Sequence, residues 1–293
     1  MRKPAMLLPV VLFVALLPAI QATAADAMRH LVDVTYAQVG AQPMRLDLHL
    51  PADRAAPLVV YLHGGAWRDG NKTQYPEFLV AHGFAVASVE FRSSNVARFP
   101  ANVHDIKAAI RFLRAKAGEY GYNAERIAIS GASSGGHLAA LVGTTNGMAQ
   151  LEGDEGAFAK ESSAVQAIVS WYGASNLHTI LAQSTPFGLS VREPALRLLL
   201  GGLPEEAPSL ARLASPVEHL DARDPPLLLM HGDQDRQMPV NQSLELEGAY
   251  RRAGLSVETF IVHGAGHGGD AFLSGEAAER AVVFLQRTIG KPR

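Results

Sequence analysis

Residues 126–143 read RIAISGASSGGHLAALVG, and this stretch decides the fold of the chain. Residues 126–130 are typical of a short buried strand, and residues 137–143 are typical of a helix. Between them, residues 131–135 form the pattern G-x-S-x-G. A serine on a sharp turn from strand to helix needs small neighbours, because the strand and the helix approach each other closely there. The stretch therefore predicts a strained turn that presents Ser133 as a nucleophile.

The pattern at this turn has two other interpretations. The chain has 27 glycines, so G-x-S-x-G could mark an ordinary tight turn, but the strand before it and the helix after it favour the nucleophile. Ser134 is the alternative hydroxyl, although it does not occupy the central position. The helix N-terminus beneath Ser133 would favour developing negative charge.

Strand and helix patterns alternate on both sides of the turn. Residues 58–63 (LVVYLH) form a continuous apolar run, as expected for a strand that is buried on both faces. This alternation predicts one α/β domain over residues 26–293, with a mostly parallel central sheet and helices on both faces. Strands are predicted at 31–39, 44–50, 58–63, 84–91, 126–130, 167–171, 227–230 and 257–262, and helices at 100–120, 137–143, 241–253 and 275–288.

One long connection interrupts this alternation. Residues 175–223 lie between two predicted core strands and far exceed the usual connection of about 2–6 residues. They include a helical pattern at Glu193–Leu200. Because loops of α/β sheets gather at the ligand-binding edge, we expect an insertion that caps this edge. The alternative is a structural decoration away from the site.

A glycine pair follows the apolar strand of residues 58–63, in the segment HGGAW of residues 63–67. It resembles the HGG-type oxyanion motif of the α/β hydrolases. The N–H of Ser134, with that of Gly65 or Ala66, would bind the oxyanion of a tetrahedral intermediate. The alternative is an ordinary Gly-Gly turn. We expect His63 to be structural and to orient this loop through hydrogen bonds.

A serine nucleophile needs a general base and an acid that orients it. This fold orders them as serine, acid and histidine, which leaves His267 and His263; His267 is favoured because it lies on the glycine-rich turn after the last strand. The acid follows the strand at 227–230, where Asp233 and Asp235 both suffice chemically. We expect Asp233 to bond its own turn and Asp235 to reach the histidine.

The first residues indicate export. A basic start, an apolar run and the small residues at 22–25 are typical of a signal peptide over residues 1–25, rather than of a membrane anchor. We therefore expect a secreted or periplasmic protein that is off the membrane once the leader is cut. With no cysteine, the chain has neither a disulfide nor a thiolate.

The net charge and the spacing of histidines and carboxylates argue against two classes of function. A net charge of −2 argues against nucleic-acid binding. No histidine or carboxylate cluster has the spacing of metal ligands, so we expect neither a metal nor an organic cofactor. The sequence gives no indication of the oligomeric state.

Four segments in this order resemble the α/β-hydrolase esterases: HGGAW, GASSGG, HGDQDRQMP and GAGHG. The resemblance covers roughly residues 30–290 and is greatest to secreted bacterial carbohydrate esterases of the feruloyl and acetyl-xylan type and to related carboxylesterases. It implies a catalytic triad of Ser133, Asp235 and His267. It also implies a structural role for Asp105.

The sequence thus predicts a secreted serine esterase that hydrolyses carboxylic esters through an acyl-enzyme, with a small-molecule or acylated carbohydrate substrate (acetyl or feruloyl esters). Two alternatives remain. A serine peptidase of the prolyl-oligopeptidase type shares this catalytic domain but usually carries a propeller domain. A non-catalytic binding protein on the same fold would be expected to lack a triad member.

Overall fold

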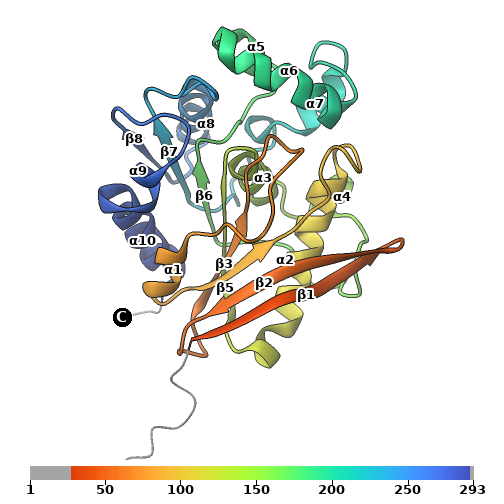
Figure 1. Ribbon diagram of the computed structural model, residues 1–293, viewed down its shortest axis with the longest axis vertical. Coiled ribbons are helices and arrows are strands. Elements are labelled where there is room, and N and C mark those ends of the chain that lie inside the picture. Colours follow the sequence, from red (N-terminus) through yellow and green to blue (C-terminus); the bar gives the residue numbers. More distant parts are fainter. Residues whose placement is uncertain (1–27, 291–293) are drawn as a thin grey trace, which may run out of the picture.

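The computed structural model describes residues 28–290, so the predicted leader at residues 1–25 lies outside the described part of the chain. Eight strands form a single sheet in the order β1-β2-β4-β3-β5-β6-β7-β8 (Figure 1). The first two strands are antiparallel, and the pairs from β4 to β8 are all parallel. This is the predicted α/β-hydrolase arrangement. The strands are β1 (Arg29–Val39), β2 (Gln42–Leu50), β3 (Pro57–Leu62), β4 (Ala85–Val89), β5 (Asn123–Ala132), β6 (Ala167–Trp171), β7 (Leu227–Gly232) and β8 (Val257–Val262).

Helices cover both faces of the sheet, as predicted, and side chains alternate between two cores. On β3, Leu58 and Val60 belong to the core beneath α2 (Ala101–Tyr120), α3 (Ser134–Gly143) and α8 (Asn241–Arg252). Val59 and Tyr61 belong to the core beneath α1 (Glu77–Ala81) and α10 (Gly275–Ile289). Because successive strand residues point to opposite faces, a strand with apolar residues at every position must be covered on both sides. The continuous apolar pattern of residues 58–63 therefore predicted the two-sided cover correctly.

The helices include those that cover the sheet and those of the long insertion. Among residues 28–290, none has the length and apolarity that crossing a membrane requires. The helices are α1 (Glu77–Ala81), α2 (Ala101–Tyr120), α3 (Ser134–Gly143), α4 (Ala149–Glu152), α5 (Ile180–Gln183), α6 (Pro186–Leu200), α7 (Pro208–Leu213), the 3-10 turn η1 (Pro216–Glu218), α8 (Asn241–Arg252), α9 (Asp270–Leu273) and α10 (Gly275–Ile289).

Parallel pairing brings the predicted site segments to one edge of the sheet. The last residue of β3, Leu62, pairs with Gly131 of β5, and Gly131 pairs with Ser170 of β6. Farther along the sheet, the last pair between β7 and β8 joins Gly232 and Val262. The loops that follow β3, β5, β7 and β8 therefore leave the sheet at the same edge, where ligands of α/β sheets bind.

The insertion between β6 and β7 contains α5, α6, α7 and η1, and Figure 1 shows the three helices together at one end of the molecule. The predicted helix Glu193–Leu200 is longer than expected, because α6 begins at Pro186. Proline is tolerated in the first turn of a helix, and the Thr185 hydroxyl accepts the N–H of Gly188 as an N-cap. The Thr185 hydroxyl also donates to the Arg236 carbonyl at 2.6 Å. The insertion thus contacts the loop after β7; its function as a cap stays a prediction.

Candidate active site

Ser133 lies on the sharp turn between β5 and α3. Its backbone has φ 56° and ψ −119°, a conformation that non-glycine residues rarely adopt, and its N–H donates to the Trp171 carbonyl at 2.9 Å. The flanking glycines are required by close packing. A Cβ on Gly131 would lie 2.4 Å from the Gly135 backbone, and one on Gly135 would lie 2.2 Å from the Leu62 carbonyl oxygen. The small residues of G-x-S-x-G therefore allow β3, β5 and α3 to meet.

Three predicted side chains form one hydrogen-bonded chain. The Nε2 atom of His267 lies 2.8 Å from the Ser133 Oγ, and its Nδ1 lies 2.6 Å from Asp235 Oδ2. An ionised carboxylate only accepts hydrogen bonds, so Nδ1 carries the proton. The lone pair of Nε2 then faces the serine hydroxyl, which donates to it. This tautomer is the one that a general base needs.

The environment of Asp235 keeps its carboxylate ionised. Burial by itself raises the pKa of Asp235, but hydrogen bonds from His231 and His267 outweigh that effect and hold the pKa well below the usual 3.8. The backbone N–H groups of Gln237 and Met238 both donate to Oδ1 at 2.8 Å. The carboxylate is therefore fixed on one side by its own turn and on the other by imidazole.

Two residues that the sequence analysis did not single out support these groups. His231 is completely buried, with Nε2 3.3 Å from Asp235 Oδ2 and Nδ1 2.7 Å from the Ser243 hydroxyl. Tyr172 packs edge-on against the His267 ring at 4.8 Å between centroids. Burial, with a contribution from Asp235, raises the pKa of Tyr172 to about 12, so this ring is neutral. The sequence held one signal for these two residues, a histidine near the end of the apolar strand LLLMHG, which is His231.

The alternative acid and base form a separate pair. Asp233 Oδ2 lies 2.9 Å from His263 Nδ1, and its Oδ1 accepts the N–H of Gly264 at 2.8 Å. The His263 side chain is 85% exposed. The expectation that Asp233 bonds its own turn was wrong: Asp235 makes the turn bonds, and Asp233 fastens the loop after β8. Of the two histidines, His267 is the one hydrogen-bonded to Ser133, because its loop folds back over the end of β5.

The loop after β3 lies beside the serine in an unusual conformation. Gly65, Ala66 and Trp67 all have positive φ, at 116°, 53° and 59°. Within residues 28–290, the N–H groups of Gly65, Ala66 and Ser134 donate no hydrogen bond. Ser134 is the first residue of α3, so its N–H has no partner inside the helix. Gly65 and Ala66 line the same pocket as Ser133, so their N–H groups could serve an oxyanion there.

Buried rings hold this loop in place. His63 Nδ1 lies 2.7 Å from the Gly64 carbonyl oxygen, and its ring stacks on Phe91 at 4.5 Å. Burial lowers the pKa of His63, so the ring is neutral and has the structural position that we expected. Trp67 Nε1 donates to His137 Nδ1 at 3.0 Å, and above the Trp67 ring lies the guanidinium of Arg192 from α6, 5.7 Å from the ring centroid.

The catalytic pocket, as we name the cavity at Ser133, has a volume of about 780 Å³. Its lining includes Tyr172, His267, Gly65, Ala66, Arg68, Tyr75 and Gln237. Among the described residues, no group of three or more histidine or acidic side chains could hold a metal ion. The chemistry that the pocket offers is nucleophilic attack by a hydroxyl, with a base and oxyanion donors in reach.

The chain is similar to several known esterases in sequence and in structure. Residues 46–250 match the family model BD-FAE. Esterase LipC of Mycobacterium tuberculosis is 29% identical over 80% of this chain and 59% of its own length. The chain spans only 49% to 59% of the first curated relatives that it matches. A truncated carbohydrate esterase from gut microbiota superposes with a TM-score of 0.82 at 31% identity, covering 92% of this chain and 99% of that one. A bifunctional GH43-CE protein of Bacteroides eggerthii superposes with a TM-score of 0.79 at 35% identity, covering 89% of this chain and 35% of that one.

Proposed function

The chain belongs to the BD-FAE family of α/β-hydrolase esterases, and on that premise we propose that it is a serine esterase acting on acylated carbohydrates. The observation that carries the mechanism is the hydrogen-bonded chain Ser133–His267–Asp235 beside unpaired backbone N–H groups. The substrate class is supported by the similarity to the gut-microbiota carbohydrate esterase, which covers nearly all of both chains.

In the proposed reaction, the Ser133 Oγ attacks the ester carbonyl carbon while its proton passes to His267 Nε2. The carbonyl oxygen becomes an oxyanion that the N–H groups of Ser134 and of Gly65 or Ala66 stabilise. His267 then gives the proton to the leaving alcohol, and the C–O bond of the ester breaks. Asp235 stabilises the imidazolium that forms in this step.

The second half of the reaction releases the acid. Water gives a proton to His267 and attacks the acyl-enzyme, and Ser133 regains that proton as the carboxylic acid leaves. The protein's own groups perform every proton transfer. The acyl group would be small or aromatic, as in acetyl or feruloyl esters.

We also propose export from the cytoplasm, which is supported by the basic and apolar pattern of residues 1–25. Cell fractionation of the full chain tests it: a product shortened near residue 25 and recovered outside the cytoplasm supports export, and a full-length cytoplasmic product refutes it.

The activity is tested with purified protein on aryl acetate, longer aryl esters, methyl ferulate, acetylated xylan and aminoacyl-prolyl amides, with Ser133→Ala as the control. Serine-dependent hydrolysis of the esters is expected. Cleavage of the amides alone would favour a peptidase, and turnover by Ser133→Ala would place the nucleophile elsewhere.

A further inference from the structure

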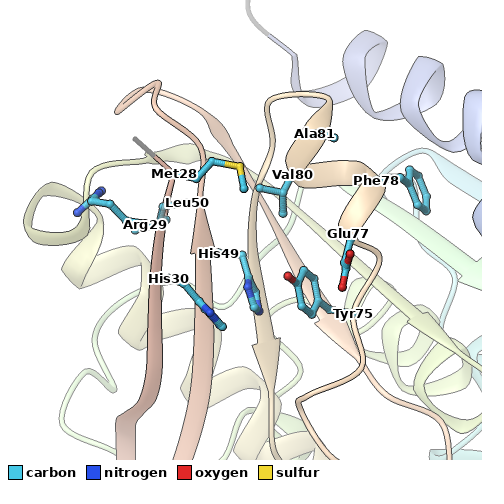
Figure 2. Close-up of a pocket in the computed structure, with 10 residues that line it drawn as sticks. All are labelled: Met28, Arg29, His30, His49, Leu50, Tyr75, Glu77, Phe78, Val80 and Ala81. Atoms are coloured by element: carbon cyan, nitrogen blue, oxygen red, sulfur yellow. The ribbon is translucent and has the colours of Figure 1, made fainter. Parts of the chain in front are cut away.

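A second cavity, of about 460 Å³, lies between the β1–β2 ribbon and helix α1. Figure 2 shows it, with Met28, Leu50 and Val80 gathered at one end. At the other end lie the rings of His30, His49 and Tyr75. The cavity is thus apolar at one end and carries ring and polar groups at the other. We call it the α1 pocket.

The three rings form a continuous stack built from separate parts of the chain. The His30 and His49 centroids are 4.2 Å apart, and the His49 and Tyr75 centroids are 3.5 Å apart with an interplanar angle of 18°. His30 and His49 face each other across the β1–β2 pair, and Tyr75 comes from the segment before α1. Stacked rings on a sheet form a rigid surface that loses little conformational entropy when a ligand binds.

Polar groups in the α1 pocket have unused hydrogen-bonding capacity. His49 is only 5% exposed, and its Nε2 has no hydrogen-bond partner among the described residues. Burial, together with the neighbouring His30, lowers the pKa of His49 to about 4, so at neutral pH its ring offers one donor and one acceptor. Glu77 forms no ion pair within residues 28–290, and its carboxylate lines the pocket, where it can accept hydrogen bonds from a ligand. The His49 nitrogen is covered by its neighbours, so a ligand hydroxyl would bind to Glu77 rather than to His49.

The α1 pocket adjoins the catalytic pocket, because Tyr75 and Glu77 line both. A substrate that reaches both must extend well beyond the scissile ester. A small aryl acetate has no group that could do so. Binding energy gained in the α1 pocket would therefore be available only to longer substrates.

We propose that the α1 pocket binds a distal sugar residue of an oligosaccharide ester whose ester lies at Ser133. The inference rests on the proposed carbohydrate esterase function. Sugars combine hydroxyl groups with apolar C–H faces, and the pocket offers partners for both: Glu77 and the Tyr75 hydroxyl for the hydroxyls, and the ring stack with Val80 for the C–H faces.

Filling the α1 pocket tests the proposal. Ala81 is exposed, ends α1 and lines the α1 pocket but not the catalytic pocket. Ala81→Trp would occupy the cavity, and Ala253→Trp is the matched control at the exposed end of α8. We would measure kcat/KM on aryl acetate, on methyl ferulate and on acetylated xylose and xylo-oligosaccharides. His30→Ala, at the exposed end of the ring stack, is a second variant that adds no bulk.

For Ala81→Trp we expect a loss of roughly tenfold or more in kcat/KM on the oligosaccharides, mainly through KM, with aryl acetate and the acetylated monosaccharide changed less than about twofold. His30→Ala should show a smaller loss of the same selectivity. Equal losses on all substrates, or a loss on methyl ferulate alone, would overturn the sugar site while leaving the esterase intact. A wild-type protein that prefers no oligosaccharide over the monosaccharide would do the same. Absence of serine-dependent aryl acetate hydrolysis would overturn the esterase and this site together.

Discussion

Replacing Asp235 with asparagine separates the two functions of this carboxylate. In the wild-type protein, the N–H groups of Gln237 and Met238 donate to Asp235 Oδ1, and the amide oxygen of asparagine can still accept both. The amide nitrogen then takes the place of Oδ2, 2.6 Å from His267 Nδ1. An amide nitrogen only donates, so His267 must present a lone pair at Nδ1 and keep its proton on Nε2. That proton points at Ser133, and the base is lost.

The expected effect on catalysis is large. A wrong histidine tautomer in a Ser-His-Asp triad lowers kcat by about 10⁴-fold. Such a loss corresponds to about 5.5 kcal/mol in activation free energy. The matched control is Asp233→Asn, which alters the exposed contacts with His263 and Gly264. The kcat of Asp233→Asn should stay within about twofold of the wild-type value, because surface substitutions usually have small effects.

The same variant has a signature in stability against pH. The pKa of Asp235 in the folded state is held below its usual value, so its contribution to stability is present above the unfolded pKa of 3.8 and is lost as the pH falls through the folded pKa. The wild-type protein should therefore lose its stability advantage over Asp235→Asn as the pH drops below about 4.

Two assays decide between these outcomes. Burst and steady-state hydrolysis of aryl acetate at pH 8 measures kcat, and urea unfolding from pH 6 to pH 2.5 measures stability. Retention of more than a tenth of the wild-type kcat by Asp235→Asn would refute the tautomer argument. A large loss of kcat in Asp233→Asn would refute it as well, because that result would make Asp233 the catalytic acid.

Three further comparisons, all by urea unfolding, test the strain and packing of residues around the site. Ser133→Gly should be more stable than Ser133→Ala by about 1 kcal/mol, because only glycine adopts φ 56° without strain; the reverse order would show that the turn is unstrained. Gly135→Ala should lower the free energy of unfolding by more than about 3 kcal/mol or prevent folding, because its Cβ would lie 2.2 Å from the Leu62 carbonyl oxygen. The control Gly118→Ala lies exposed on α2 with open space around it, so it should raise stability by about 0.5 kcal/mol. Arg192→Met should leave stability unchanged or raise it, because this guanidinium is buried without a hydrogen-bond partner among the described residues; a loss above about 2 kcal/mol would mean that its contact with a ring outweighs the cost of burial.

Local sequence patterns predicted the eight strands, the helices α2, α3, α8 and α10, and the turn at Ser133. The period of apolar residues specifies these strands and helices locally, and G-x-S-x-G specifies the close approach of β3, β5 and α3. The long helix α6 was predicted only over Glu193–Leu200; it begins at Pro186, because proline is favourable at a helix start. The order of serine, acid and histidine along the chain also followed from sequence reasoning.

Which side chains meet depends on the folded arrangement of distant segments. Ser133 and His267 are 134 positions apart, and no local pattern determines how the loop after β8 folds back over the end of β5. The residue types alone could not assign the turn bonds to Asp235 and the loop contacts to Asp233, since both are aspartates on one segment. The ring stack of His30, His49 and Tyr75 was likewise hidden, because three distant segments meet there through sheet register and the packing of α1 rather than through any spacing in the sequence.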